Sequence, residues 1–358
     1  RLRSQGSPDK EITFVDAIKG EIKLPENIHD IVLLKKDGIP TYHFAHAIDD
    51  HLMRTTTVVR GGEWLASAPI HYELFHLLGF KMPAYAHTAH LMKFDEETGG
   101  KRKLSKRKDP ELSLDYYRKD GYHPYTMKVY LLTLLNSNFE EWHEKFPDKD
   151  INEFPFSVEK MNQSGALFDK DKLHNICKNE LSKLSEEELY DFLYDWAKEN
   201  EPENVEKWFG DREKMLQILR LYMGVGAKRR RKDLMYAKQI FELISYFFDG
   251  ESAEEMDEFK LDEDMVSKIL KSYLAKYDHN DDNSVWFNKL KEIADEHGFA
   301  SDMKAYKANP ENFKGNVSDI AEAVRIAVTG RANTPDLWTI VHIMGEEQMT
   351  ERIKKHIK

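Results

Sequence analysis

The sequence predicts an α/β region followed by an all-α region, and three observations support this. Up to Gly62, short runs alternate apolar with polar residues, as half-buried strands do. Gly-containing turns separate these runs. Beyond about residue 110, apolar residues recur with the period of amphipathic helices. With 358 residues, of which 41% are hydrophobic, the chain is long enough for several domains.

The strand-like runs come first along the chain. "EITFVDAIKGEIKL" predicts two strands around Gly20. Residues 31–34 and 42–48 predict a second pair, joined by a turn at Lys36-Asp37-Gly38, and "TTTVVRGG" predicts another strand. A helix should follow, with Ser67 as its cap, Pro69 in its first turn and Gly79 at its end.

The later segments carry helix start and stop signals. Ser185 and Glu188 form a predicted capping box before an apolar stripe. One further helix is expected from a Ser318 cap to Gly330. Another is expected from a Thr334 cap, with Pro335 at its first position, to Gly345.

Composition limits the class of protein. The single cysteine, Cys177, excludes an intramolecular disulfide and a multi-cysteine zinc site, and it indicates a reducing, cytoplasmic compartment. No run is apolar enough to suggest a membrane span, and no signal peptide is recognisable. Because the chain starts at Arg1 without a methionine, we expect it to be a fragment of a longer protein.

The segment "KRKLSKRK" (101–108) concentrates positive charge in a chain of net charge -11. Gly99 and Gly100 precede it and Asp109-Pro110 follows it, which predicts a mobile loop. Lysines on such a loop suit the phosphate oxygens of a nucleotide. A solvated surface loop or a nuclear-localisation-like patch would have the same composition.

The surrounding sequence resembles one enzyme family. "KLSKR" (103–107) is similar to the second signature motif of class I aminoacyl-tRNA synthetases. Residues 37–80, 164–176 and 324–347 resemble, in order, three blocks of bacterial glutamyl-tRNA synthetases. The resemblance implies the second half of a Rossmann-type catalytic domain, a helical stem-contact domain and two helical anticodon-binding domains. The implied boundaries are 1–100, including the end of the connective insertion, then 101–183, 184–254 and 255–358.

The implied activity is that of a glutamate–tRNA ligase. Such an enzyme uses ATP to activate glutamate as glutamyl-adenylate, releases pyrophosphate, and transfers the amino acid to the 3′ end of tRNA(Glu) with release of AMP, for translation. The implied cofactors and partners are ATP, Mg²⁺, glutamate and tRNA(Glu), with no protein-bound zinc, no membrane and a monomeric state. The family's first signature, a His-Ile-Gly-His-like turn, does not occur in the sequence, so we expect the chain alone not to form the adenylate efficiently.

Other functions stay open. A non-catalytic tRNA-binding paralogue would also lack the first signature, and a non-discriminating enzyme would also charge tRNA(Gln). A glutaminyl-tRNA synthetase fits less well, because that family ends in β-barrels whereas this C-terminal region is predicted to be helical. The short paralogue that modifies a tRNA base lacks an anticodon domain.

The resemblance assigns the nucleotide site residue by residue. Lys103, Ser105 and Lys106 are the implied catalytic residues that grip ATP, with Lys106 the principal one and Arg107 assisting. Backbone groups of Leu91 and Met92 would hold the adenine. Glu63 and Trp64 would lie beside ATP and the tRNA 3′ end.

The glutamate site is implied at Arg60, Tyr42 and His46. A guanidinium can hold the substrate side-chain carboxylate with two parallel hydrogen bonds. His46 stands where asparagine is frequent in the family, and Gly62 where an acidic residue is common. A metal site formed by nearby side chains is a rival interpretation, with His43, His46, Asp49, Asp50 and His51 as its candidate ligands. We expect no metal there, because side chains alternate on a strand and His43 would diverge from His46.

The resemblance also implies the residues that read the tRNA. The anticodon candidates are Arg231, Arg325, Thr334, Pro335 and Leu337. Arg229 and Arg230 of "AKRRRKDL" are expected on phosphates, although a solvated charge run is the alternative. A predicted helix start at Thr334 and Pro335 would leave free N–H groups for a phosphate or a base edge.

Overall fold

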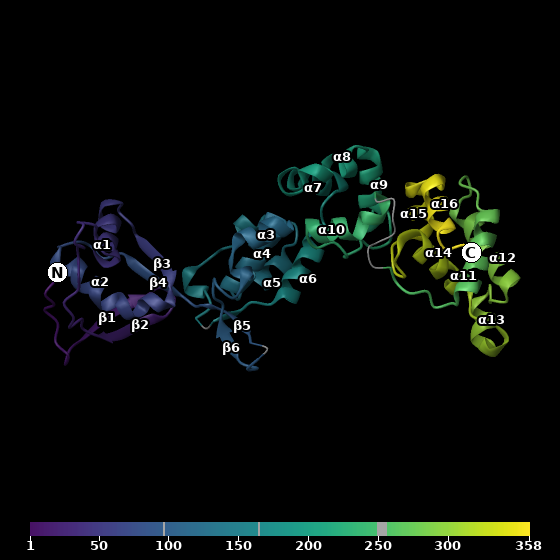
Figure 1. The fold of residues 1–358 in the computed structure, drawn as a ribbon. Helices are drawn as coiled ribbons and strands as arrows, with labels where there is room; N and C mark the ends of the chain where they lie inside the picture. Colours follow the sequence, from purple (N-terminus) through teal and green to yellow (C-terminus); the bar gives the residue numbers. More distant parts are fainter. Residues whose placement is uncertain (96, 164, 249–255) are drawn as a thin grey trace. The chain divides into compact units, whose positions relative to one another are not determined.

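The computed structural model describes residues 1–95, 97–163, 165–248 and 256–358. These residues form two compact units, which are treated separately. The first comprises Arg1–Tyr116 and Pro124–Leu173, and the second comprises Tyr117–His123 and His174–Lys358. The predicted class, α/β followed by all-α, is confirmed (Figure 1). The predicted boundary between residues 254 and 255 lies outside the described residues.

The first unit contains two small sheets. The strands of the larger sheet lie in the order β2-β1-β4-β3, with β1 antiparallel to β2 and parallel to β4, and with β3 parallel to β4. The smaller sheet has the order β6-β5-β7. The strand bounds are β1 Glu11–Asp16, β2 Gly20–Pro25, β3 Thr57–Gly61, β4 Ala84–Thr88, β5 Leu91–Phe94, β6 Lys101–Lys103 and β7 Ala166–Leu167.

Helix α2 (Ala68–Leu77) contributes to a small apolar core on the larger sheet. The alternation in β1 buries Ile12 and Phe14, which join Tyr85 of β4 and Ala68 in a small core. The helices of this unit are α1 Tyr42–Leu52, η1 Gly62–Ser67, α2 Ala68–Leu77, η2 Pro110–Leu112, α4 Pro124–Leu135, α5 Phe139–Lys145, η3 Ile151–Glu153 and η4 Val158–Lys160.

The predicted strand at residues 42–48 is wrong, because these residues belong to helix α1. Ala47 on α1 is fully buried against Leu74 and Phe75 of α2, and this packing outweighs the β-propensity of the aromatic and branched residues. Residues 31–34 form no strand either, apart from one bridge between Leu34 and Pro40. The turn at 36–38 is present, with Gly38 at φ +81°.

The second unit is helical and has one continuous hydrophobic core that extends from Leu181 to Ile353. Two helices, α3 Leu114–Asp120 and α6 Lys170–Leu181, run from the first unit into the second. The other helices are α7 Glu186–Asn200, η5 Pro202–Asn204, α8 Val205–Phe209, α9 Arg212–Met223, α10 Ala237–Ile244, η6 Ser245–Phe247, α11 Glu263–Lys276, α12 Asn283–His297, α13 Met303–Ala308, η7 Pro310–Asn312, α14 Val317–Thr329, α15 Leu337–Met344 and α16 Glu346–Lys354.

The predicted helix caps are partly correct. Ser185 and Glu188 form the expected capping box. Ser67 stands at the N-cap of α2 but its side chain accepts no capping hydrogen bond. Asn316 caps α14 in place of Ser318, and Asp336 caps α15 in place of Thr334. In both cases a longer Asx side chain two residues away reaches the free N–H groups.

The two serine N-caps give a matched stability test. Replacement Ser185→Ala removes a side-chain acceptor from the first turn of α7 and should lower the free energy of unfolding by about 1 kcal/mol. Ser67→Ala removes no cap hydrogen bond and should change the free energy of unfolding by less than about 0.5 kcal/mol. Urea unfolding followed by circular dichroism measures both, and equal losses would contradict the role of the capping box.

Candidate functional site

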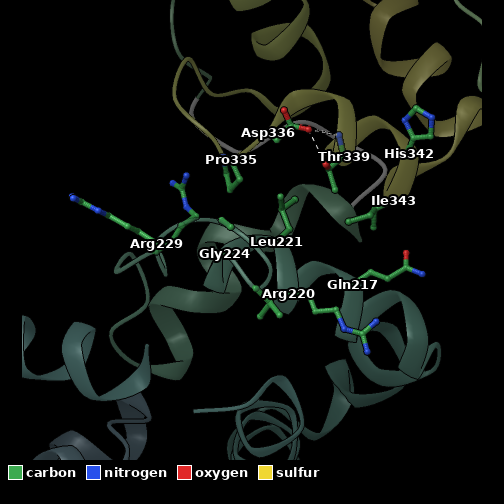
Figure 2. A pocket seen from close by; sticks show the side chains of 13 residues that line it. Gln217, Arg220, Leu221, Gly224, Arg229, Pro335, Asp336, Thr339, His342 and Ile343 are labelled. Atoms are coloured by element: carbon green, nitrogen blue, oxygen red, sulfur yellow. Dashed lines mark hydrogen bonds between the residues drawn. The ribbon is translucent and has the colours of Figure 1, made fainter. Parts of the chain in front are cut away.

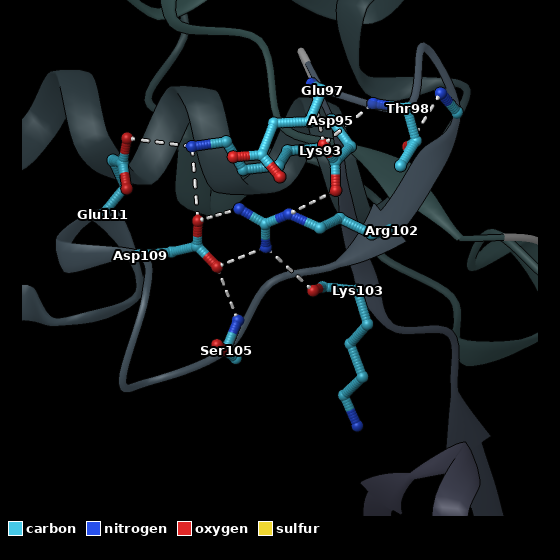
Figure 3. Close-up of polar contacts among 10 residues, drawn as sticks. Lys93, Asp95, Glu97, Thr98, Arg102, Lys103, Ser105, Asp109 and Glu111 are labelled. Atoms are coloured by element: carbon cyan, nitrogen blue, oxygen red, sulfur yellow. Dashed lines mark hydrogen bonds and ion pairs between the residues drawn. The ribbon is translucent and has the colours of Figure 1, made fainter.

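Asp109 organises the basic segment 101–108 (Figure 3). Its side chain is fully buried and accepts two hydrogen bonds from Arg102, both 2.7 Å long. It also accepts the backbone N–H of Ser105 at 2.8 Å and lies 3.3 Å from Lys93 Nζ. The hydrogen bonds from Arg102 hold the pKa of Asp109 well below its usual range, so the carboxylate is charged.

This arrangement divides the cations of the segment into two groups. Arg102 is neutralised by Asp109 and, at 3.4 Å, by Asp95. The side chains of Lys106, Arg107 and Lys108, all among the described residues, are exposed and make no hydrogen bond or ion pair. Backbone hydrogen bonds from Lys108 and Asp109 to the carbonyl of Ser105 form the turn that presents them. The segment is therefore a braced turn that carries unneutralised cations.

The prediction of a loop throughout 101–108 needs a correction. Residues 101–103 form strand β6, in which Lys103 pairs with Met92 of β5, and Leu104 is buried. Only the part that starts after Leu104 is a turn. The hydrogen bonds of β6 hold residues 101–103, and the buried side chain of Leu104 holds the end of the strand.

Two predicted nucleotide contacts come together in this unit. Lys103 Nζ lies 3.8 Å from Glu63 Oε1, and Glu63 Oε2 lies 3.4 Å from His90 Nδ1. A backbone hydrogen bond within Glu63, together with Lys103 and His90, lowers the pKa of this half-exposed carboxyl. The predicted adenine contacts lie on β5, where the carbonyl of Leu91 accepts from Leu104 N–H at 3.0 Å and that of Met92 from Phe168 N–H at 2.7 Å.

The predicted glutamate contacts on β3 and α1 also converge, and Trp64 of η1, predicted beside ATP, joins them. The ring of Tyr42 lies 4.3 Å from that of Trp64 and stacks parallel to His46 at 5.8 Å, measured between ring centroids. The guanidinium of Arg60 donates to the carbonyl of Trp64 at 3.4 Å and lies 4.5 Å over the ring of Tyr85. The side chains form an aromatic cluster around one cation.

Uncharged histidines surround Arg60. His71 is fully buried on α2, where its Nδ1 accepts from Arg60 at 3.1 Å and its Nε2 lies 2.9 Å from His43 Nδ1. Burial, together with His46, Arg60 and His43, lowers the pKa of His71 to about 2. Burial also lowers the pKa values of His43 and His46. Arg60 is therefore the one permanent cation of this pocket within the described residues.

The expectation that His43 and His46 diverge on a strand is wrong. His43 and His46 lie on helix α1, not on a strand, and both rings contact His71, with centroids 5.1 and 4.6 Å apart. Their nitrogens contact other side chains: His46 lies 2.5 Å from Asp50 and 2.7 Å from the hydroxyl of Tyr85. Across the described residues, no group of three or more His, Cys, Asp or Glu side chains is arranged to hold a metal ion.

Sequence reasoning missed Asp109 and His71 as members of these sites. Asp109 was recognised only as the end of a loop. An acid four residues after Ser105, at the end of a basic run, is the signal that could have indicated its role. His71 had no such signal, because its contacts with Arg60 and His43 arise only when α2 packs on α1 and the sheet.

A groove of about 670 Å³ lies between α9, the loop that follows it, and the start of α15 (Figure 2). Its apolar and polar lining residues are Gln217, Arg220, Leu221, Gly224, Val225, Ala227, Arg229, Arg231, Pro335, Asp336, Thr339, His342 and Ile343. Gly224 ends α9 in the left-handed conformation, at φ +65°. The loop then returns to the helix, where Arg231 N–H donates to the carbonyl of Met223 at 2.9 Å.

The cations of this groove differ in their pairing. Arg220 pairs with Glu186 at 3.0 Å, and Arg231 with Asp233 at 2.6 Å. Arg229 forms no ion pair with any described residue, and Figure 2 shows its side chain extending outward from the loop. The groove thus offers an apolar floor beside one unneutralised guanidinium, which suits a planar base attached to a phosphate.

The other predicted anticodon residues are placed differently. Pro335 lines the groove, whereas Leu337 is only 3% exposed and packs in the core, so only its backbone can meet a ligand. Arg325 is half-buried on α14 and donates to the carbonyl of Ala332 at 3.4 Å. Thr334 does not cap α15. Because Asp336 already accepts the N–H of Thr339 at 2.8 Å, the expected row of free N–H groups is shortened.

Comparisons with known proteins identify the class. Residues 1–175 match the family described as "tRNA synthetases class I (E and Q), catalytic domain", and residues 188–357 match an anticodon-binding domain. The fold and these matches define a class I aminoacyl-tRNA synthetase. Within that class, the chain belongs to the glutamate–tRNA ligase family. No helix among the described residues is long and apolar enough to cross a membrane.

The similarity to relatives extends over almost the whole chain. A glutamate–tRNA ligase of Acetivibrio thermocellus is 54% identical over 99% of this chain and 64% of its own length. A glutamate–tRNA ligase of Alkaliphilus metalliredigens is 30% identical over 99% of this chain and 67% of its own length. A crystal structure of the Elizabethkingia meningosepticum glutamate tRNA ligase in complex with its amino acid matches with a TM-score of 0.69 and 25% identity, over 98% of this chain and 66% of that one. The chain thus spans about two thirds of the length of these relatives.

The neutral histidines make the first unit sensitive to acid. His71 takes up a proton near its ordinary pKa of 6.5 in the unfolded chain but only at about 2 in the folded one. The unfolded state therefore binds more protons below pH 6.5, and stability should fall as pH falls, by about 1.4 kcal/mol per pH unit for this group.

Urea unfolding of the first unit between pH 8 and 5 measures this effect. His71→Gln should make the profile below pH 6.5 less steep, whereas His76→Gln on the exposed side of α2 should not. A profile of the unchanged protein that is flat down to pH 5 would contradict a neutral His71.

Proposed function

We propose that this chain is the tRNA-reading and nucleotide-gripping part of a glutamate–tRNA ligase. The observation that carries the proposal is the pairing of two anion sites in one compact unit. Arg60 supplies a single fixed cation in an aromatic cluster, and the braced turn after Leu104 supplies cations without an ion pair among the described residues. The salt bridge between Glu63 and Lys103 joins them. One site suits a carboxylate substrate and the other a polyphosphate.

In this proposal, Arg60 holds the side-chain carboxylate of glutamate, and Tyr42 and His46 complete the pocket. Lys106, with Lys103, Ser105 and Arg107, stabilises the negative charge that develops on ATP as the glutamate α-carboxylate attacks the α-phosphorus and pyrophosphate leaves. Glu63, Trp64 and the backbone of Leu91 and Met92 border the nucleotide. The 3′-terminal ribose hydroxyl of tRNA(Glu) then attacks the adenylate carbonyl and AMP leaves. The rate enhancement comes from positioning of the reactants and from stabilisation of charge, without a covalent enzyme intermediate.

Mg²⁺ is proposed to accompany ATP. The exposed carboxylate of Glu63 beside Lys103 is compatible with a metal whose ligands are mostly phosphate oxygens and waters. Bound there, the ion would add positive charge next to the phosphates. We expect a monomer that works in the cytoplasm.

The groove beside Arg229 is the proposed contact for the anticodon end of the tRNA, with Arg231 and Pro335 on its wall. Arg325, Thr334 and Leu337 are proposed contacts outside it, and Arg230 is proposed on a phosphate. An apolar floor accepts a stacked base, and the unpaired guanidinium of Arg229 accepts a phosphate. Whether tRNA(Gln) also fits depends on this surface.

Binding of the chain to tRNA(Glu), tRNA(Gln) and an anticodon-exchanged tRNA(Glu), across a salt series, tests the tRNA part. Binding should follow the anticodon and weaken steeply with salt. Arg229→Ala should lower the slope of log K against log salt by about one. Arg212→Ala, which removes a cation paired with Glu187 at the opposite end of α9, should leave the slope unchanged. Equal affinity for all three RNAs would contradict anticodon reading.

Lys106→Ala in the full-length gene product tests the catalytic part. Because Lys106 is exposed and without an ion pair among the described residues, its loss should not disturb the turn. The rate of adenylate formation with glutamate, ATP and tRNA(Glu) should fall by at least about a hundredfold, while tRNA affinity stays within about twofold. Lys81→Ala is an exposed control. If adenylate forms at the normal rate, Lys106 has no part in it, and if the unmodified protein forms none, the non-catalytic paralogue is the better function.

A further inference from the structure

A buried carboxylate supports Arg60 through an intervening ring. Asp16, at the end of β1, lies 2.6 Å from His87 Nδ1 on β4. His87 Nε2 in turn accepts a hydrogen bond of 2.9 Å from Arg60 Nε on β3. The side chains of Asp16 and His87 are both fully buried. Three neighbouring strands of one sheet therefore carry a continuous line of acid, imidazole and guanidinium.

The hydrogen-bond donors and acceptors determine which ring nitrogens of His87 and His71 carry a proton. A guanidinium only donates, so His87 Nε2 must be an acceptor and its proton must lie on Nδ1, facing Asp16. By the same argument His71 Nδ1 accepts from Arg60, and the proton on His71 Nε2 points to His43. Burial, opposed by the hydrogen bond to Asp16, lowers the pKa of His87. The line therefore has one negative end, one positive end and a neutral ring between them.

The backbone fixes the orientation of Asp16 itself. Its Oδ1 accepts the N–H groups of Ile18 at 3.0 Å and Lys19 at 2.9 Å, and its Oδ2 accepts both the ring and, at 3.1 Å, the N–H of His87. Burial raises the pKa of Asp16, but these hydrogen bonds outweigh burial and the net pKa is lowered. The carboxylate is charged and cannot rotate.

We propose that Asp16 and His87 are positioning residues for glutamate recognition, which keep Arg60 charged, oriented and open to the substrate carboxylate. This inference rests on the proposed function. A carboxylate in direct contact with Arg60 would occupy the guanidinium edge that a substrate needs for two parallel hydrogen bonds. The ring of His87 places the compensating charge one residue further away.

The hydrogen bonds of Arg60 agree with this arrangement. A guanidinium has five N–H groups, and His87, His71 and the carbonyl of Trp64 take one each. Two N–H groups stay available for a ligand. Because the surrounding histidines are neutral, the described residues place no second cation beside Arg60, so the site should select a substrate with a single side-chain carboxylate over its uncharged amide.

The first test measures the tautomers in the chain itself. A long-range ¹H–¹⁵N spectrum of the imidazoles distinguishes a protonated ring nitrogen from an unprotonated one. We expect His87 to be protonated on Nδ1 alone, and His71 on Nε2 alone, from pH 8 to 6. A proton on His87 Nε2, in either a neutral or a doubly protonated ring, would overturn the proposal.

The second test changes one atom of Asp16. In Asp16→Asn, Ile18 and Lys19 should hold the amide oxygen, so that the amide nitrogen faces His87 Nδ1. Two donors then oppose each other, and His87 must move its proton to Nε2, toward Arg60. In the full-length gene product, the KM for glutamate in tRNA(Glu) charging should rise at least about tenfold, while the KM for ATP stays within about twofold. Asp9→Asn, the same change on an exposed residue before β1, should alter neither.

His87→Asn covers the case in which Asp16→Asn fails to fold. Its amide N–H can still donate to Asp16, but its oxygen does not reach the position of His87 Nε2, so Arg60 loses that acceptor. In the folded variant, verified by circular dichroism, the KM for glutamate should therefore rise selectively. A loss of kcat with an unchanged KM for glutamate in either folded variant would overturn the proposal. Absence of charging by the unmodified protein would instead overturn the proposed function, while the spectrum would still decide the geometry of Arg60.

Discussion

A cation that must bind an anionic partner cannot be neutralised by its own protein, and the first unit depends on this constraint. Arg102 forms an ion pair with the buried Asp109 and thereby holds the turn in place. Lys106 stays exposed and has no ion pair among the described residues. Arg60 is supported from Asp16 only through His87, so part of its guanidinium stays open. In both sites a buried acid, Asp109 or Asp16, determines the geometry. The basic side chain that is left for a ligand, Lys106 or Arg60, does not contact that acid directly.

The two units hold their sites by different means. In the second unit, one continuous apolar core fixes α9 and α15, and the groove beside Arg229 is a gap between helices that are already packed. Around the larger sheet of the first unit, the apolar clusters that contain Ile12 and Ala47 are small, and polar contacts hold Arg60 and Asp109 in place. Polar networks in low dielectric are directional, which suits sites that must place charge accurately.

Much of this could be predicted from sequence, because local signals carried it. The β1–β2 hairpin, the capping box at Ser185 and the basic turn follow from short-range patterns, and the grouping of Tyr42, His46 and Arg60 follows from the family resemblance. The strand predicted at 42–48 failed because packing of Ala47 against α2 is a tertiary effect. His71, His87 and Asp16 could not be found for a related reason: each gains its role from a partner on another strand or helix, distant in sequence.

The loop after α9 carries exposed side chains for ligand contact, whereas the packed helices keep the second unit folded. The hydrogen bond from Arg231 N–H to the carbonyl of Met223 fixes the length of the loop, and the left-handed Gly224 fixes its direction. The side chains from Val225 to Lys232 are all exposed and add little to the core. Side chains of this loop can therefore be exchanged one at a time to alter what the surface contacts, while the packing of the helical scaffold stays the same.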